Sequence, residues 1–90
     1  MDAVKTKTIQ STETLLGSPA TVVLFNDDFH TMDEVTAQIV KAIGCSAQRA
    51  EEIMMQAHTT GRAVVIAAHL ERCEHVAGLL EQIGLAVEVE

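Results

Sequence analysis

Residues 21–35, TVVLFNDDFHTMDEV, restrict the fold of this chain more than any other stretch. Thr21 to Phe25 is a run of β-branched and apolar residues, which predicts a buried strand. Thr31 and Glu34 have the spacing of a capping box, so a helix is expected to begin at Met32. Between strand and helix lies a short loop that starts with three oxygen-bearing side chains: Asn26, Asp27 and Asp28. Loops held at both ends by regular structure often carry function.

The rest of the chain predicts three helices and two further strands. Apolar residues recur at helical spacing in three segments that are each followed by a glycine: 32–43, 47–60 and 70–83. An unbroken apolar run in 62–68 and the alternation of apolar and acidic residues in 85–90 predict strands. The expected order is therefore β-α-α-β-α-β. The simplest closed arrangement is an α/β fold of the α+β type, a two-layer sandwich with a three-stranded antiparallel sheet packed against three helices.

The 90 residues are expected to form one domain with a short extension. Residues 1–19 are rich in Thr and Ser and have no sustained apolar period, so they predict a flexible N-terminal extension. Residues 20–90 form the predicted domain. Its core should be aliphatic, because only two residues of the chain are aromatic.

Charge and cysteine content exclude several classes of partner. Thirteen acidic and six basic residues give a net charge of −7, which disfavours nucleic acid and anionic membranes and favours cationic ligands. Cys45 and Cys73 are too few for a disulfide framework. We find no signal peptide and no apolar run long enough to span a bilayer. A cytoplasmic protein is therefore expected.

The polar loop admits four interpretations. Its oxygens could bind Ca²⁺ or Mg²⁺, although the loop lacks the ligand spacing of an EF-hand. Asp27 and Asp28 could act as a general acid and base with His30 or His58. The oxygens could capture an ammonium group, which needs several acceptors when it leaves water. Finally, Asn and Asp are ordinary turn residues that could simply end the strand.

A pocket beside this loop is suggested by helical spacing. Met54 and His58 are four residues apart and so share one face of the second helix. Together with Met32 and Val35 of the first helix, they could line a small apolar pocket with the loop oxygens at its rim. Such a pocket would suit a ligand that is cationic at one end and hydrophobic at the other. The plainer interpretation is that Met54 fills the core and His58 is structural.

His69 and Cys73 are also four residues apart and could hold a transition metal. Two side chains do not make a zinc site, which takes four ligands or three and a water. We therefore expect no metal, and we expect Cys73 to belong to the core.

Two motifs in this chain together resemble the ClpS family. The first, N-D-D-[aromatic]-x-x-M-[DE]-x-V, covers residues 26–35, and the second, A-x-x-I-M-x-x-x-H-x-x-G-[KR]-A-V, covers residues 50–64. ClpS proteins are adaptors that deliver proteins with destabilising N-terminal residues to a Clp protease complex. The order of elements expected after residue 64 also fits this family.

The resemblance implies roles for individual residues. Asn26, Asp27 and His58 would bind the free α-amino group of a cargo protein. Its first side chain, typically Phe, Leu, Tyr or Trp, would enter a hydrophobic pocket, whose residues are His30, Met32, Val35, Met54, Ala57 and Leu85. Within that pocket Met32 would exclude β-branched side chains. His30 stands where the family commonly has Thr and Ala57 where Val is frequent, so the preferred side chain is expected to shift.

The resemblance also implies partners. The adaptor would pass its cargo to a Clp AAA+ unfoldase of the ClpA or ClpC type, and Arg72 would be a docking residue for it. No catalysis and no cofactor are expected. Two alternatives compete with this interpretation: a small enzyme built on Asp27, Asp28 and His58, and a ClpS-like or ribosomal-stalk-like protein interaction module that does not bind peptide N-termini.

Overall fold

The computed structural model describes residues 17–90 and confirms the predicted order of elements. The elements are β1 (Pro19–Phe25), α2 (Met32–Ile43), α3 (Ala47–Thr60), β2 (Arg62–His69), α4 (Leu70–Glu81) and β3 (Val87–Val89). β1 begins one residue before the predicted domain boundary. The first sixteen residues of the predicted extension lie outside the described part of the chain.

The three strands form the predicted antiparallel sheet, in the order β2-β1-β3. β1 lies in the centre, and its residues Val22 to Leu24 are almost fully buried. The register between β1 and β2 shifts at Val22/Val23, which marks a β-bulge or similar irregularity. β3 pairs with β1 over only three residues, from Val87 to Val89. The strand predicted in 85–90 is therefore shorter than expected.

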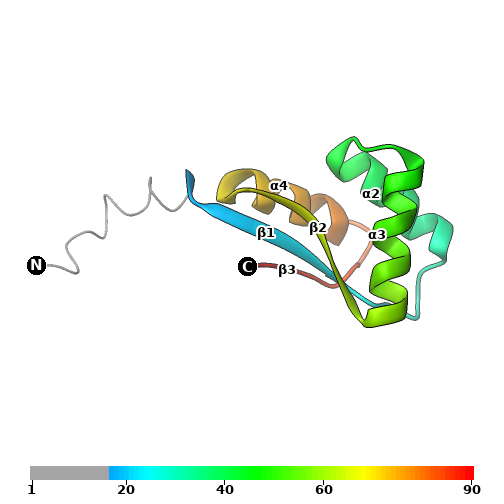
Figure 1. Cartoon of the computed structure of the whole chain (residues 1–90). Coiled ribbons are helices and arrows are strands. Elements are labelled where there is room, and N and C mark those ends of the chain that lie inside the picture. Colours follow the sequence, from blue (N-terminus) through cyan, green and yellow to red (C-terminus); the bar gives the residue numbers. More distant parts are fainter. Residues whose placement is uncertain (1–16) are drawn as a thin grey trace, which may run out of the picture.

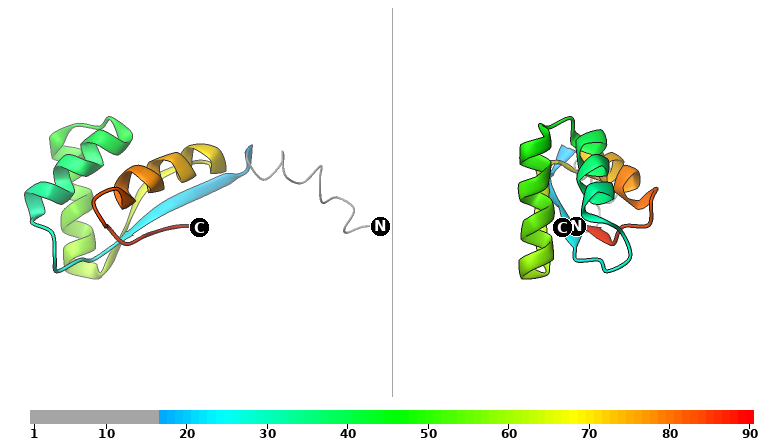
Figure 2. Two further views of the ribbon diagram at one scale, coloured as in Figure 1. Left: turned by 180° about the vertical axis from the view of Figure 1, so that it is seen from behind. Right: turned by 90° about the vertical axis from the view of Figure 1, so that its right-hand side faces the viewer.

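The helices fall into two groups (Figures 1 and 2). α4 lies along the sheet and packs against all three strands, while α2 and α3 stand together at the end where β1 stops. α2 rests on the two other helices rather than on the sheet. The side chain of Gln38, almost fully buried, donates a hydrogen bond to the Leu79 carbonyl at 2.6 Å and so joins α2 to α4. This arrangement leaves the end of β1 facing α2 and α3.

The core is aliphatic, as expected, and Cys73 is part of it. The largest fully buried side chains come from all the packed layers: Leu24, Ile39, Ile53 and Leu80. Cys73 is fully buried, with its Sγ 3.5 Å from the Ala68 carbonyl. His69 caps the N-terminus of α4 instead of pairing with Cys73, since its Nδ1 accepts from the Arg72 N–H at 3.4 Å.

Within residues 17–90 no cluster of three His, Cys, Asp or Glu side chains is suited to hold a metal ion. Within the same range no helix combines the length and the apolar character needed to cross a bilayer.

Candidate functional site

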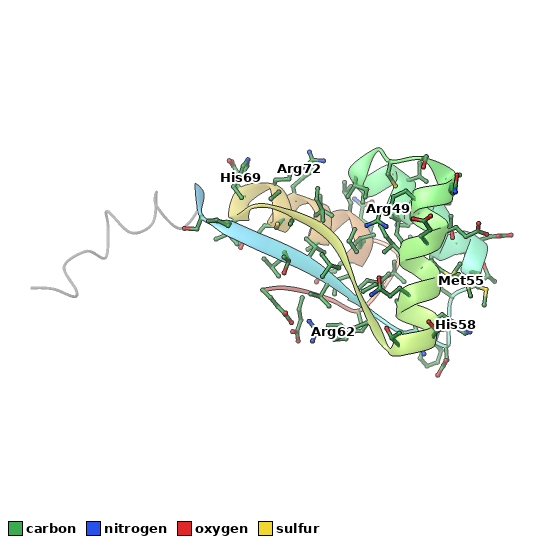
Figure 3. The ribbon with its side chains drawn as sticks, viewed as in Figure 1. Arg49, Met55, His58, Arg62, His69 and Arg72 are labelled. Carbon is green, nitrogen blue, oxygen red and sulfur yellow. The ribbon has the colours of Figure 1, made fainter. Side chains whose placement is uncertain are left out.

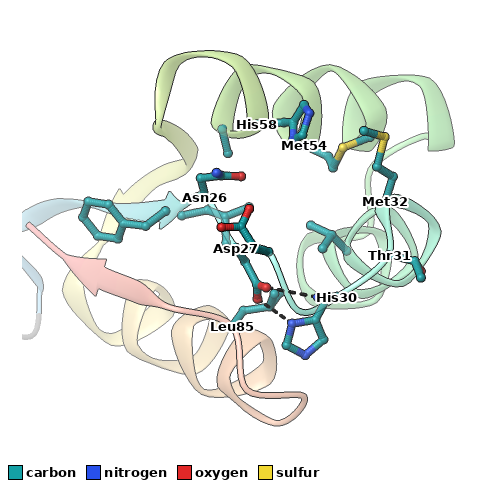
Figure 4. Close-up of a pocket in the computed structure, with 13 residues that line it drawn as sticks. Asn26, Asp27, His30, Thr31, Met32, Met54, His58 and Leu85 are labelled. Atoms are coloured by element: carbon teal, nitrogen blue, oxygen red, sulfur yellow. Dashed lines mark hydrogen bonds and ion pairs between the residues drawn. The ribbon is translucent and has the colours of Figure 1, made fainter.

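A cavity of about 290 Å³ opens where β1 ends, between α2, α3 and the loop that joins β1 to α2 (Figure 4). All nine residues assigned above to the amine site and the hydrophobic pocket line this cavity: Asn26, Asp27, His30, Met32, Val35, Met54, Ala57, His58 and Leu85. They come from four separate parts of the chain: the loop after β1, α2, α3 and the segment before β3. The fold thus brings together side chains that are up to 59 positions apart in the sequence.

Two residues of the rim, Asn26 and His58, are brought together by the end of α3. Gly61 ends that helix with a φ of 96°, a conformation that only glycine adopts readily. The Gly61 carbonyl then accepts the Asn26 backbone N–H at 3.0 Å. His58 lies in the last turn of the same helix and is exposed. Figure 4 shows the two side chains on the same side of the cavity.

The carboxylate of Asp27 is held by the loop itself. Its Oδ1 accepts the backbone N–H groups of Phe29 at 2.5 Å and of His30 at 3.0 Å, and its Oδ2 pairs with the His30 ring at 2.5 Å. Burial acts to raise the pKa of Asp27, but hydrogen bonds from Phe29 and His30 and the nearby His30 charge together hold it below 3.8. Asp27 is therefore an ionised group in a fixed orientation.

His30 does not simply add to the apolar wall. Its Nδ1 faces Asp27, and its Nε2 bonds to the carbonyl oxygen of Ile83 in the turn after α4. The hydrogen bonds to Asp27 and Ile83 raise the pKa of His30 above 6.5. The ring therefore joins the polar loop to the segment that leads into β3. The sequence alone predicted only that His30 would be a pocket residue.

The apolar part of the cavity has a buried floor and one exposed residue at its mouth. Val35, Met54, Ala57 and Leu85 are all less than a tenth exposed, whereas Met32 is 45 % exposed. Met32 is the first residue of α2, and the capping box predicted at Thr31 and Glu34 is present beside it. The start of α2 is thus fixed at the edge of the cavity.

The residue assignments from sequence missed three lining residues, Leu24, Phe25 and Thr31, and placed Asp28 at the rim only as one of the loop oxygens, without a binding role. The first two end β1, so their position next to the polar loop was a usable signal. Asp28 is exposed and makes no hydrogen bond or ion pair within the described residues, unlike Asp27. The neighbouring Phe29 points into solvent and is 94 % exposed.

Arg72 lies away from the cavity. It belongs to the first turn of α4, is exposed, and lies together with His69 at the opposite end of the molecule from His58 and Met55 (Figure 3). The described chain also begins at that end, because the Leu70 N–H donates to the Ser18 carbonyl at 2.8 Å.

The cavity combines an acidic, oxygen-rich rim with an apolar floor. Its volume is near the lower limit of small-molecule sites, which are roughly 300 to 1,000 Å³. The space is suited to one side chain and an attached polar group rather than to a large ligand. The charges favour a cation at the rim, since Asp27 is ionised and Asp28 is open to solvent.

Comparison with known proteins gives a consistent result. Residues 17–88 match the family model described as "ATP-dependent Clp protease adaptor protein ClpS". A ClpS adapter of Synechococcus elongatus is 36 % identical over 70 residues, covering 77 % of this chain and 74 % of that protein. A 57-residue part of the E3 ubiquitin-protein ligase UBR1 of Drosophila melanogaster is 39 % identical, covering 63 % of this chain and 3 % of that protein.

Among solved structures, Agrobacterium tumefaciens ClpS2 bound to L-phenylalaninamide has a similar fold. Its TM-score is 0.73 at 26 % sequence identity, and the match covers 82 % of this chain and 99 % of that one. L-Phenylalaninamide carries a free amino group next to a hydrophobic side chain.

Proposed function

The chain belongs to the ClpS family of ATP-dependent Clp protease adaptors, and we propose that it binds proteins through a free N-terminal hydrophobic residue. As a member of this family it is a non-catalytic adaptor rather than an enzyme. The observation that carries the proposal is the cavity at the end of β1, with its acidic rim and apolar floor.

Physical chemistry supports the match between this cavity and a peptide N-terminus. An α-amino group titrates near pH 8, so it is largely cationic at neutral pH. We propose that Asn26, Asp27 and His58 bind this group and that the first side chain lies on the floor formed by Val35, Met54, Ala57 and Leu85. Burying that side chain contributes roughly 1.5 to 3 kcal/mol. Met32 at the mouth would be the residue that rejects β-branched side chains.

The proposed ligands are Phe, Leu, Tyr and Trp at the first position. Ala57 favours the larger ones, because a methyl group at this floor position leaves more room than a branched side chain. The competing proposal is a member of the family that has lost N-terminal recognition and serves only as an interaction module.

We also propose a second partner, a Clp AAA+ unfoldase of the ClpA or ClpC type, with Arg72 in its docking surface. The separation of Arg72 from His58 supports this, since cargo and unfoldase could then be bound at the same time. Both would meet in the cytoplasm, and the two free cysteines, Cys45 and Cys73, suit that reducing compartment. Arg72→Glu should reduce delivery to the unfoldase and leave peptide affinity unchanged.

The predicted extension, residues 1–19, is proposed to act in cargo transfer rather than in recognition. Its described part begins at the Arg72 end, where the Ser18 carbonyl accepts the Leu70 N–H at 2.8 Å. A protein that begins at Gly17 should bind peptides like the full chain but should support slower degradation of the cargo. Equal degradation rates would contradict this assignment.

Fluorescence anisotropy with labelled peptides tests the recognition proposal. The peptides differ only in residue one (Phe, Leu, Trp, Val or Arg), and one further Phe peptide is acetylated. We expect binding of free Phe, Leu and Trp peptides and much weaker binding of the Val, Arg and acetyl-Phe peptides. Equal affinity for the free and the acetylated Phe peptide would exclude capture of the amino group.

A further inference from the structure

The ring of His30 connects two segments that are distant in the sequence. Its Nδ1 lies 2.5 Å from Asp27 Oδ2, and its Nε2 bonds to the carbonyl oxygen of Ile83, 53 positions further along. Gly84, the neighbour of Ile83, has a φ of 87°, a conformation that glycine adopts readily, and it lies against the ring: a Cβ there would be in ordinary van der Waals contact, 3.7 Å from His30 Cε1. The imidazole side chain is only 18 % exposed.

The two partners of this ring fix its protonation state. A carboxylate and a backbone carbonyl are both acceptors, so each ring nitrogen must carry a hydrogen to satisfy its contact. Only the imidazolium form has both. Asp27 in the loop and Glu34 in α2 are the charged side chains whose fields favour this form. From the α4–β3 side, the ring faces the Ile83 carbonyl near the C-terminal end of α4, where the helix dipole is negative.

Each end of the connection belongs to a different half of the pocket. Asp27 is the carboxylate proposed for the amino group, and Leu85, two residues after Ile83, is part of the floor proposed for the side chain. Leu85 is 4 % exposed, yet its own backbone N–H makes only a long 3.4 Å bond to the Leu80 carbonyl. The neighbouring backbone is held by the Phe25 N–H, which donates to the Ala86 carbonyl at 3.0 Å, and by the contact from His30 to Ile83, so His30 is one of the constraints on where the Leu85 segment lies.

We propose that His30, as an imidazolium, is a positioning residue that holds the amine-binding carboxylate and the Leu85 wall of the pocket at a fixed separation. This inference rests on the proposed function, since it concerns how the two halves of that site are aligned. His30 contacts neither half as a ligand-binding group; it acts through Asp27 and through the backbone of Ile83.

The connection depends on pH in a defined direction. When the ring loses a proton, one nitrogen presents a lone pair to an acceptor, and that contact becomes repulsive. The folded His30 pKa is raised, so the connection is complete below 6.5 and is lost as pH rises through the higher folded value. The segment that carries Leu85 should then move relative to the loop in the free protein.

The first experiment needs no ligand. The methyl resonances of Leu85 and the carboxyl carbon of Asp27 are followed by NMR during a pH titration of the wild-type protein. We expect both to shift with one common midpoint above 6.5, equal to that of the His30 ring. His30→Gln should abolish this step, whereas His75→Gln on the exposed side of α4 should keep it. If the Leu85 methyl resonances do not shift as His30 titrates, the proposal is wrong.

The second experiment measures alignment through affinity. Free Phe and free Ala peptides are titrated against wild type, His30→Gln and His75→Gln below the unfolding temperature of each variant. His30→Gln should lose roughly tenfold in Phe affinity, the value of the charged hydrogen bond between the ligand amine and a misaligned Asp27, and should discriminate less between Phe and Ala. His75→Gln should match wild type. If His30→Gln loses stability but keeps the wild-type ratio of Phe to Ala affinity, His30 has only a structural role.

The two experiments fail separately. If wild-type protein binds no free Phe peptide, the proposed function is wrong, but the NMR titration still shows whether His30 couples Asp27 to Leu85. If the peptide binds and Leu85 does not follow His30, only the positioning role is wrong.

Discussion

Asp27 is a residue with two separate tasks in the polar loop. Its Oδ1 orders the backbone by accepting from Phe29 and His30, and its charge is the part proposed for the ligand. The two tasks respond differently to substitution, because Asn keeps an acceptor for the backbone amides but has no charge. Removal of the whole side chain, by contrast, mixes a folding effect with a binding effect.

We therefore expect Asp27→Asn to lower Phe-peptide affinity by roughly tenfold or more, the value of a hydrogen bond to a charged group, and to destabilise the fold less than Asp27→Ala, because Asn loses the ion pair with His30 but keeps an acceptor for the amides. Asp27→Ala should lower affinity as well and also cost about 0.5 to 1.5 kcal/mol of unfolding free energy through the lost hydrogen bonds to the loop amides, which are only partly shielded from water. Peptide anisotropy and thermal melts measure the two effects. Wild-type affinity in Asp27→Asn would remove this carboxylate from the amine site.

The ion pair between Asp27 and His30 predicts how stability depends on pH. The pKa of His30 is raised in the folded protein, so its contribution is present below 6.5 and is lost as pH rises through the folded value. The pKa of Asp27 is lowered, so its contribution is present above 3.8 and is lost as pH falls through the folded value. Denaturant unfolding at a series of pH values should show both losses.

His30→Gln serves as the control for that series. This variant should not lose stability as pH rises. As pH falls, it should still lose the part of the stability that comes from the backbone hydrogen bonds to Asp27. An alkaline loss of the same size in His30→Gln would assign the effect to another group.

At the scale of single elements, the N-terminus of α2 is part of the site and that of α3 is not. Thr31 and Glu34 form a reciprocal capping box beside the cavity. Ser46 caps α3 with one bond, to the Arg49 N–H at 3.0 Å, and does not line the cavity. The two caps are chemically similar but differ in what they hold in place.

Thr31→Ala and Ser46→Ala should each cost about 1 kcal/mol of unfolding free energy, the usual value for a lost N-cap. Only Thr31→Ala should also weaken peptide binding, because Met32 at the pocket mouth loses its fixed helix start. Urea titration gives the first quantity and anisotropy the second. Equal affinity in the two variants would show that the rim does not depend on this cap.

At the scale of the whole molecule, charge is expected to govern the encounter with cargo. The net charge is −7, and the cargo end proposed to bind is cationic. Opposite charges raise association rates, and salt screens this effect over a Debye length of about 10 Å at 0.1 M. The association rate of a Phe peptide should therefore fall as salt is added, while its dissociation rate changes little.

Asp28→Asn and Glu88→Gln test whether the charge near the cavity matters most. Each removes one negative charge, from an exposed rim residue and from an exposed residue of β3 respectively. In stopped-flow measurements, Asp28→Asn should slow association more than Glu88→Gln does. Equal slowing would mean that only the total charge counts.

Local patterns determined much of this protein. The strand that ends at Phe25, the capping box at Thr31 and the glycines that end α2 and α3 depend on neighbours in the sequence, and each of these features is present as predicted. The order of elements and the antiparallel sheet follow from the same periodicities. The two motifs, 26–35 and 50–64, also contain eight of the nine predicted side chains that line the cavity, and the ninth is Leu85.

Only the tertiary structure decided what those side chains contact. β3 pairs with only three residues of β1, Val22 to Leu24, and α4 stops at Glu81, where a turn that contains Gly84 follows. The position of His30 depends on a carbonyl 53 residues away, so no local pattern could indicate that its ring bridges Asp27 and Ile83. Periodicity reports which face of an element is buried; which atoms meet across that face is determined by how the elements pack.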